Sequence, residues 1–377
     1  VSEALFIGLQ ALKSHHREVM TRNGVALEFH TPVCTTYTHP KERVLFYPER
    51  DANPFFHLME SFWMLAGRND VEWISKFNGR INNYSDDGVT FHGAYGFRWK
   101  RWFGYDQIER IVMRLKTYPN DRRSVLSMWD PREDLVVSND GKDYPCNTQI
   151  FFSVRDKVLD MTVVNRSNDL IWGAYGANAV HMSILQEYIA AKIECEVGTY
   201  YQLSNNLHAY KDILDTLSDM GADYEPYLTI GKGGLKYTPI PLITNIKTFD
   251  EELIQWFKDE DRTEYENTYL GTTASRVRKS WRLWKRKEIN ESMRIASTIE
   301  DRAWRKACAE WLLRKKPWEM TTLYKKKLLT RRKTWKNNTP KSLKLWNKLQ
   351  TKMLQHLTKQ KNTMETVGRK GEELGHL

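Results

Sequence analysis

The sequence predicts an α+β fold with a helical, basic C-terminal extension. Its length of 377 residues, of which 41% are hydrophobic, is enough for one large domain and an appendage. Two segments with alternating hydrophobicity, 149–154 and 158–164, flank a short polar turn and are typical of paired strands. From about Pro239 onward the spacing of apolar residues becomes helical. We therefore expect strands and helices in the first part of the chain and helices in the last.

Several further elements are predicted in the first part. Helical spacing covers residues 3–20, and a turn at 22–24 precedes a strand over 25–29. Pro54 begins a strongly apolar helix that Gly67 ends. The other expected elements are a helix over 107–116, a turn over 119–123, a strand over 124–129, a helix over 179–195 and a strand over 198–203.

The C-terminal part combines helical segments with positive charge. Helical spacing covers residues 249–258, 274–287 and 299–314. Residues 314–361 carry sixteen Lys/Arg and one acid, a net charge of +15, so the rest of the chain carries −4 of the total of +11. A nucleic acid or an acidic partner is therefore expected for this tail rather than for the main domain. A solvated, flexible tail over 317–377 is the open alternative.

Neither a membrane span nor secretion is expected from the sequence. No run of about 18 apolar residues occurs, and the apolar N-terminal stretch lacks the basic region and cleavage site of a signal peptide. The four cysteines are widely spaced without a CxxC pair, which predicts neither a zinc site nor a disulfide framework. A reducing cytoplasm is the expected compartment.

The densest set of reactive side chains lies between residues 144 and 178. Cys146 follows Pro145 in a polar turn just before the first of the two alternating strands. A polar cluster at residues 165–169, which includes an arginine, a serine and an aspartate, follows the second strand. Cysteine, arginine, serine and aspartate at the ends of adjacent strands favour a reactive site.

Other polar positions allow a structural or a functional interpretation. Glu60 lies in a strongly apolar helix, where a carboxylate is either satisfied by a partner or catalytic. Arginines in turns are either solvated or hold an anion, and a His–Tyr pair that alternates along a strand is either structural or binds a polar ligand. These positions are Arg22, Arg122, Arg123, His208 and Tyr210.

Seven motifs of the chain carry a family likeness. The chain resembles the thymidylate synthase and pyrimidine-nucleotide hydroxymethylase family over roughly residues 17–215. Seven motifs in the family's order leave little room for coincidence. They are Glu60-Ser-Phe-Trp-Met-Leu-Ala-Gly67, Tyr95-Gly96-x-x-Trp99, Asp121-Arg122-Arg123, Pro145-Cys146, Arg166-Ser167-x-Asp169, Gly173 and His208-x-Tyr210.

The resemblance implies a fold, a cofactor and a reaction. The fold is a large twisted mixed sheet packed with helices, in a homodimer whose active sites borrow arginines from the partner subunit. The reaction transfers one carbon from 5,10-methylenetetrahydrofolate to C5 of a pyrimidine nucleoside 5′-monophosphate. We accordingly divide the chain into a catalytic domain over 1–240, a helical extension over 241–316 and a basic tail over 317–377.

The resemblance also implies roles for single residues. Cys146 would be the nucleophile, with Glu60, Tyr95 and Arg166 as the other catalytic residues. A thiolate that adds to C6 of a pyrimidine makes C5 nucleophilic, so the reaction needs covalent catalysis. Arg166 would also hold the phosphate, for which planar guanidinium donors are suited. The remaining implied residues are Asp169 and Gly173 for the folate, and Arg22, Arg122, Arg123, Ser167, Asn147, Ala177, Asn178, His208 and Tyr210 for the nucleotide.

The chain departs from the synthases at the base-reading positions. Asn147 follows the nucleophile where synthases usually have histidine. Synthases read uracil with an asparagine four residues after the family glycine, where dCMP hydroxymethylases have aspartate. An ungapped count from Gly173 gives Ala177, and Asn178 comes next. The resemblance therefore leaves uracil and cytosine, and so dUMP and dCMP, both open.

The end of the chain favours hydroxymethylation over methylation. The closing C-terminal segment that synthases fold over the folate has no match here. Without that shield, water rather than hydride is expected to capture the exocyclic methylene group. Members of this form are common among phage enzymes that make modified DNA precursors, and for a phage enzyme the compartment would be the host cytoplasm.

Three alternatives are kept. A thymidylate synthase would release dihydrofolate and dTMP. A non-catalytic nucleic-acid-binding protein on an enzyme scaffold would bind DNA in a salt-sensitive way, although intact Cys146, Glu60 and Arg166 argue against it. A cysteine protease would pair Cys146 with His181 or His208, but no protease signature surrounds the cysteine.

Overall fold

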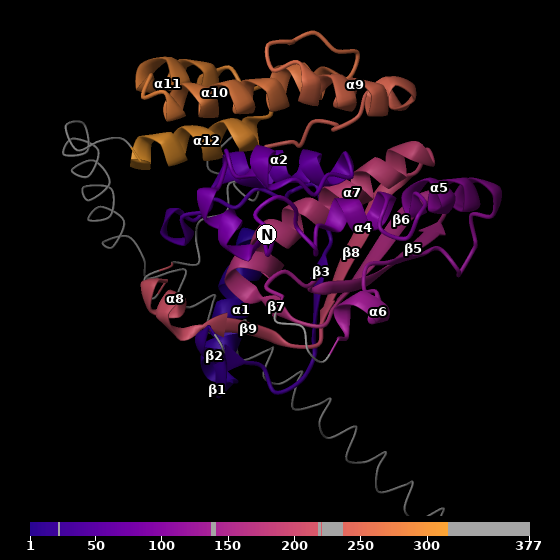
Figure 1. The fold of residues 1–377 in the computed structure, drawn as a ribbon, viewed down its shortest axis with the longest axis vertical. Coiled ribbons are helices and arrows are strands. Elements are labelled where there is room, and N and C mark those ends of the chain that lie inside the picture. The colour runs from indigo at the N-terminus through magenta and orange to yellow at the C-terminus, as the bar shows by residue number, and fades with distance from the viewer. Residues whose placement is uncertain (22, 137–140, 218–219, 221–236, 316–377) are drawn as a thin grey trace, which may run out of the picture. The chain divides into compact units, whose positions relative to one another are not determined.

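The computed structural model describes residues 1–21, 23–136, 141–217, 220 and 237–315. Within these ranges the chain has the predicted α+β class, with helices around two mixed sheets (Figure 1). Residues 1–315 form one compact unit. Arg22 and the expected tail over 317–377 lie outside the described residues, and the division at residue 240 stays a prediction. Every helix in the described ranges is too short or too polar to cross a bilayer.

The larger sheet contains five strands in the order β3-β8-β6-β5-β4. All neighbours are antiparallel except β6 and β8, which are parallel. One face is buried, and a row across it contains Leu126, Ile150, Val163 and Gln202. The two predicted alternating strands are confirmed as the hairpin β5–β6. The bounds are Val33–Tyr37 for β3, Val125–Ser127 for β4, Asn147–Arg155 for β5, Val158–Asn165 for β6 and Glu196–Ser204 for β8.

The smaller sheet has the order β1-β2-β9-β7, and only β7 and β9 run parallel. The prediction of one helix over 3–20 is wrong in its second part, because α1 ends at Ser14 and a strand begins at Arg17. The buried stripe of α1 ends at Leu12, and the backbone beyond it pairs with β2. The bounds are Arg17–Thr21 for β1, Gly24–Glu28 for β2, Asn168–Asp169 for β7 and Leu207–Tyr210 for β9.

Helices cover the sheets. Most predicted helices are confirmed within a few residues, but α11 was not expected. The elements η1 and η2 are 3₁₀ helices, and η3 and η4 are π-type segments. The bounds are α1 (Ser2–Ser14), η1 (Pro48–Arg50), α2 (Pro54–Leu65), α3 (Val71–Ile74), η2 (Gly79–Tyr84), α4 (Tyr95–Lys100), α5 (Gln107–Thr117), α6 (Pro131–Asp134), η3 (Leu170–Ala177), α7 (Asn178–Lys192), α8 (Lys211–Thr216), α9 (Ile246–Lys258), η4 (Leu270–Ala274), α10 (Ser275–Lys285), α11 (Ile289–Ser297) and α12 (Arg302–Lys315).

The ends of α2 follow from its sequence. The Asn53 side chain accepts a hydrogen bond from the Phe56 backbone N–H at 3.1 Å, which satisfies one of the free donors of the first turn. Pro54 occupies the first helical position, where its missing N–H costs nothing. Gly67, with a φ of +67°, follows the helix and allows the left-handed conformation that ends it. The predicted helix between Pro54 and Gly67 is confirmed.

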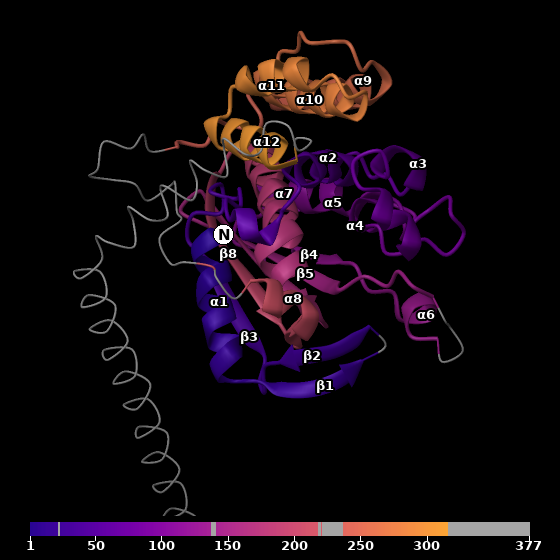
Figure 2. The same ribbon diagram turned by 90° about the vertical axis from the view of Figure 1, so that its left-hand side faces the viewer.

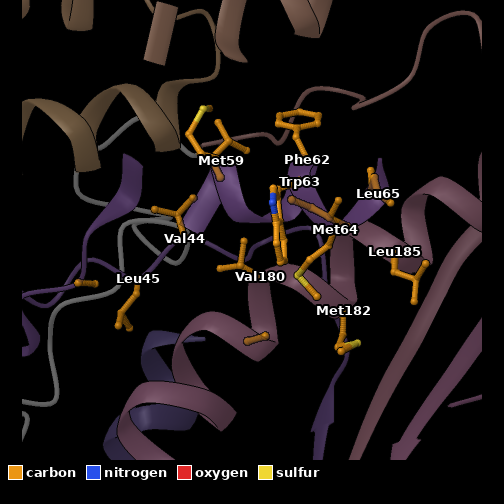
Figure 3. Close-up of a cluster of buried hydrophobic side chains, with 14 of the residues drawn as sticks. Val44, Leu45, Met59, Phe62, Trp63, Met64, Leu65, Val180, Met182 and Leu185 are labelled. Atoms are coloured by element: carbon orange, nitrogen blue, oxygen red, sulfur yellow. The ribbon is translucent and has the colours of Figure 1, made fainter. Parts of the chain in front are cut away.

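Two layers of helices bury α2. On one side lies α7, and Figure 3 shows Trp63 and Met64 of α2 near Val180 of α7. On the other side lie α10 and α12 (Figures 1 and 2), where the Phe55 ring is 5.3 Å from the ring of Trp281. Because α2 carries Glu60, the C-terminal helices support the helix that presents this carboxylate.

Candidate active site

Cys146 lies in the loop just before β5, and Arg166 holds this loop. The Arg166 backbone N–H donates to the Cys146 carbonyl at 2.9 Å. Its side chain donates from Nε to the Pro145 carbonyl at 3.0 Å and from Nη2 to the Tyr144 carbonyl at 3.3 Å. The strand pairing of β5 with β6 thus brings the cysteine and the arginine together, as expected. A guanidinium beside a cysteine favours its thiolate form, which is the nucleophilic one.

Tyr95 joins this loop to α2. The Asn147 backbone N–H hydrogen-bonds the Tyr95 side chain, and burial raises the pKa of Tyr95 well above its usual value. The charges of Cys146 and Glu60 add to that shift, so both groups lie near the hydroxyl. The hydroxyl therefore stays protonated between the cysteine and the carboxylate.

The glycine after Tyr95 explains how closely its helix approaches α2. A Cβ atom at Gly96 would lie 1.9 Å from the carbonyl oxygen of Met64, so only glycine allows this packing. The Tyr95-Gly96 segment is therefore a packing motif, which places Tyr95 against α2.

Glu60 and His181 face each other between α2 and α7. The Glu60 carboxylate lies 3.0 Å from Nε2 of His181, and the two side chains are 16% and 4% exposed. The angle does not suit a direct hydrogen bond, so Nε2 has no hydrogen-bond partner within the described chain. The His57 ring lies 6.5 Å from the His181 ring.

Buried side-chain amides form a chain behind the site. Nδ2 of Asn178 donates to Oδ1 of Asn168 at 3.1 Å, and Nδ2 of Asn168 donates to the Ser204 hydroxyl at 3.1 Å. These contacts assign the orientation of both amides. A Cβ atom at Gly173 would lie 2.6 Å from Oδ1 of Asn168, so the glycine leaves room for this chain.

Asn147, which was expected to contact the nucleotide, is fully buried. Its Nδ2 donates to the Asn165 side chain, whose own Nδ2 donates to the Leu203 carbonyl at 3.2 Å. Oδ1 of Asn147 has no hydrogen-bond partner among the described residues. Asn147 thus ties the nucleophile loop to the sheet.

Ala177 is the last residue of η3, and Asn178 is the first residue of α7. A π-type turn contains one residue more than an α-helical turn, and η3 is further kinked at Gly176, where φ is −135° and ψ is −113°. Asn178 begins α7 and belongs to the amide chain, whereas Ala177 offers no polar side-chain atom. The extra residue explains why an ungapped count from Gly173 stops one position short of an asparagine.

Asp169 lies between backbone donors and cations. Its Oδ1 accepts hydrogen bonds from the N–H groups of Ile171 at 2.8 Å and Trp172 at 2.7 Å. Burial raises the pKa of Asp169, against the effect of these N–H groups, of His208 and of Arg50. The Trp172 ring is 46% exposed and packs under the Arg50 guanidinium, 4.0 Å away. An open aromatic surface thus lies next to a carboxylate.

His208 and Tyr210 lie on the same side of β9, as expected, while the alternate residues Leu207 and Ala209 are buried. The parallel pairing of β7 with β9 sets His208 opposite Asp169. The Asn206 side chain hydrogen-bonds Nδ1 of His208 at 2.8 Å.

The predicted turn with two arginines is held by its aspartate. Asp121 accepts two hydrogen bonds from Arg114, at 2.7 and 2.8 Å, and one from the Arg123 backbone N–H at 2.9 Å. Arg122 and Arg123 are exposed, and the Arg123 side chain is 79% exposed. Ser167 is half-buried next to Arg166, and the outcome for Arg22 lies outside the described residues.

Sequence reasoning missed several polar residues of this region. His181 was considered only as the partner of a protease cysteine, and no function was expected of Arg50, His57 or Asn168. Asn168 stands inside a recognised motif, so its position was a signal. His57 and His181 looked like polar interruptions of apolar helices, and only the packing of α2 on α7 brings them together.

A family model described as thymidylate synthase matches residues 18–230, more than half of the chain. The chain is 44% identical to the deoxyuridylate hydroxymethyltransferase of Pseudomonas phage M6 over 78% of this chain and 87% of that one. Proteins of the same name from Bacillus phage SP01 and Delftia phage PhiW-14 are 38% and 30% identical, over 52% and 58% of this chain and 53% and 63% of their own lengths. The chain therefore belongs to the thymidylate synthase family.

Proposed function

We propose that the chain converts deoxyuridine 5′-monophosphate into its 5-hydroxymethyl derivative. The chain is an enzyme that transfers one-carbon groups, as its family and its relatives indicate. The proposal is carried by the phage relative named deoxyuridylate hydroxymethyltransferase, which matches most of the chain. The buried Asn178 amide supports it by offering uracil a suitable partner.

Cys146 is the nucleophile of this proposal. Its thiolate adds to C6 of the uracil ring and makes C5 electron-rich enough to accept the one-carbon unit. Arg166 supports this role because its three hydrogen bonds hold the Cys146 loop and its charge favours the thiolate. The last step expels the thiolate when the C5=C6 double bond forms again.

Asn178, rather than Ala177, reads the base. Because one N–H of its Nδ2 is engaged by Asn168, the amide is held with Oδ1 and the second N–H available. Uracil offers N3–H as a donor and O4 as an acceptor, so one amide satisfies both. Cytosine presents the opposite pattern and would require the amide to turn and lose its bond to Asn168.

The nucleotide phosphate and sugar are assigned to the other polar residues. Arg166 and Ser167 hold the phosphate, together with Arg22 and with arginines from a second subunit. The sugar lies against the half-buried residues that alternate on β9, His208 and Tyr210. Asn147 is expected to act through the Cys146 loop, because its side chain is buried behind it.

The family is folate-dependent in general, and the residues around Asp169 suit such a cofactor. A pterin ring is flat and carries N–H donors, which match the exposed face of Trp172 and the carboxylate beside it. Asp169, Trp172 and Gly173 would hold 5,10-methylenetetrahydrofolate. When bound, this cofactor supplies a one-carbon unit at the oxidation level of formaldehyde.

Glu60 and Tyr95 handle protons and water. The Glu60 carboxylate accepts the proton of the water that attacks the methylene group on C5. Tyr95, held protonated between Cys146 and Glu60, orders that water. These roles require both groups to lie on the same side of the base.

A homodimer completes the proposed site. The second face of the larger sheet carries a row of exposed or half-buried side chains: Val125, Phe151, Thr162, Tyr201 and Thr36. Phe151 in this row is 39% exposed. Such a face suits a second copy of the chain. The exposed Arg122 and Arg123 would then reach the partner's phosphate site.

The second candidate is thymidylate synthesis, which the description of the matching family model favours. The two reactions share Cys146 and the nucleotide but differ in the last step. Hydride from the cofactor would give dTMP and dihydrofolate, whereas water gives the hydroxymethyl nucleotide and tetrahydrofolate.

The test is a product assay with matched substrates. The enzyme is incubated with 5,10-methylenetetrahydrofolate and either dUMP or dCMP, and the nucleotide is identified by its mass. We expect dUMP to gain one CH₂O unit without formation of dihydrofolate, and Cys146→Ser to give no product. A methylated product with dihydrofolate, or reaction of dCMP alone, would overturn the proposal.

The cytoplasmic location and a nucleic-acid or acidic partner for residues 317–377 stay predictions.

A further inference from the structure

Glu60 meets a histidine that the family resemblance did not assign. Nε2 of His181 lies 3.0 Å from the Glu60 carboxylate, and the histidine side chain is only 4% exposed. The two residues come from α2 and α7, which pack against each other. Their meeting is therefore a product of the fold rather than of a local motif.

The pair lacks an aligned hydrogen bond. Nε2 is buried without a hydrogen-bond partner in the described part of the chain, although the carboxylate is within reach. A buried donor without a partner destabilises the fold, so its neighbour is expected to be functional or to realign. Catalytic hydrogen bonds are often poorly aligned until the reacting complex forms. A rotation of the Glu60 carboxyl group completes the hydrogen bond with Nε2 of His181.

The second histidine at this place does not compete for the carboxylate. Burial lowers the pKa of His57 well below its usual value of 6.5, and the charges of Arg50 and His181 lower it further. His57 is therefore neutral at physiological pH. His181 is the imidazole in contact with Glu60.

The opposite side of the pair faces the nucleophile. Tyr95 from α4 is close enough to Glu60 and Cys146 for their charges to raise its pKa, and Asp143 adds to the effect. Glu60 therefore lies near both His181 and the group formed by Tyr95 and Cys146.

We propose that His181 is a positioning residue for hydroxymethylation, which holds the Glu60 carboxylate aimed at the attacking water. This inference rests on the proposed function. Water forms a bond to the methylene carbon, and the electron pair of the C=C bond moves toward C5 and the C4 carbonyl. The water proton passes to Glu60, and the return of the electron pair expels the Cys146 thiolate.

Two variants of His181 and one control test the role. His181→Met removes the donor, and we expect kcat to fall about 10- to 100-fold while KM for dUMP stays within about threefold. His181→Gln returns a donor near Nε2 and restores part of kcat.

Met182→Leu changes a buried neighbour on the same helix at nearly constant volume and is expected to keep kcat. A His181→Met enzyme with kcat within twofold of wild type, or a His181→Gln enzyme no more active than His181→Met, would overturn the inference. A wild-type enzyme that forms no hydroxymethyl product would instead overturn the proposed function.

A second measurement covers the case in which His181→Met does not fold. The His181 ring protons are observed by nuclear magnetic resonance in the wild type and in Glu60→Gln. Loss of the carboxylate is expected to shift their resonances, because a charged group 3.0 Å from Nε2 is removed. Identical ring resonances in the two proteins would show that the pair does not interact and would overturn the inference.

Discussion

Single residues around the site depend on neighbours that hold their orientation. Asn178 is an example, because its amide is assigned by one hydrogen bond to Asn168, which Ser204 holds in turn. Base selection is therefore expected to depend on a chain of three side chains.

Replacement of Asn178 by aspartate tests this dependence. An ionised carboxyl group does not offer the donor that O4 of uracil needs, but it accepts a hydrogen bond from N4 of cytosine. We expect Asn178→Asp to lose about 10- to 100-fold in kcat/KM for dUMP and to gain activity on dCMP. Competition assays with both nucleotides give the ratio. An unchanged preference for dUMP would remove Asn178 from the base-reading role.

His57 is expected to lower the free energy of unfolding as the pH falls below 6.5. The folded chain binds a proton at His57 only well below pH 6.5, whereas the unfolded chain binds it near pH 6.5. Below pH 6.5 the unfolded state thus holds more protons, so acid destabilises the fold by up to about 1.4 kcal/mol per pH unit. Urea unfolding at pH 7.5 and 5.5 is expected to show a smaller loss in His57→Gln than in the wild type. Equal losses would contradict the assignment.

At the scale of elements, α2 is stabilised from both sides. Trp281 of α10 packs on Phe55, and its indole N–H donates to the Lys76 carbonyl at 2.8 Å. We expect Trp281→Ala to lower the free energy of unfolding by about 3–5 kcal/mol, as for other buried aromatic residues. Ile254→Ala on α9 is the control, because that side chain is 51% exposed and should change stability by about 0.5 kcal/mol or less. Equal effects in chemical unfolding would mean that α10 does not support α2.

The elements that could be predicted were those with a local signal. The hairpin β5–β6 and the helix α2 follow from alternation and from capping residues. The strand at Arg17–Thr21 was missed because the helical spacing before it was extended too far, although the strand pairs with the next one, β2, from Thr21 opposite Gly24. The kink of η3 was missed because periodicity does not mark an extra residue in a turn.

In the whole molecule, the proposed phosphate site requires two subunits. If Arg122 and Arg123 complete the partner's phosphate site, the double variant Arg122→Ala/Arg123→Ala and the variant Cys146→Ser are each inactive alone. Mixed dimers contain one intact site, so a mixture after subunit exchange is expected to recover about a quarter of wild-type activity. Arg155→Ala, an exposed arginine on the β5–β6 hairpin, is the control that keeps activity. No recovery in exchanged dimers would restrict the arginines to their own subunit.

The candidate site was predictable where it lies in motifs and not where it depends on distant contacts. Cys146 and Arg166 were recognised from sequence, and the strand pairing joins them through backbone and side-chain hydrogen bonds. The contact of Glu60 with His181 spans two helices far apart in the chain, so no spacing rule could reveal it.

The most direct test of the account is a single turnover with dUMP and 5,10-methylenetetrahydrofolate in ¹⁸O-labelled water. The account predicts a nucleotide that carries one ¹⁸O atom in its new hydroxymethyl group, together with tetrahydrofolate. A methylated nucleotide without the label, together with dihydrofolate, would contradict it and would make hydride the group that captures the methylene.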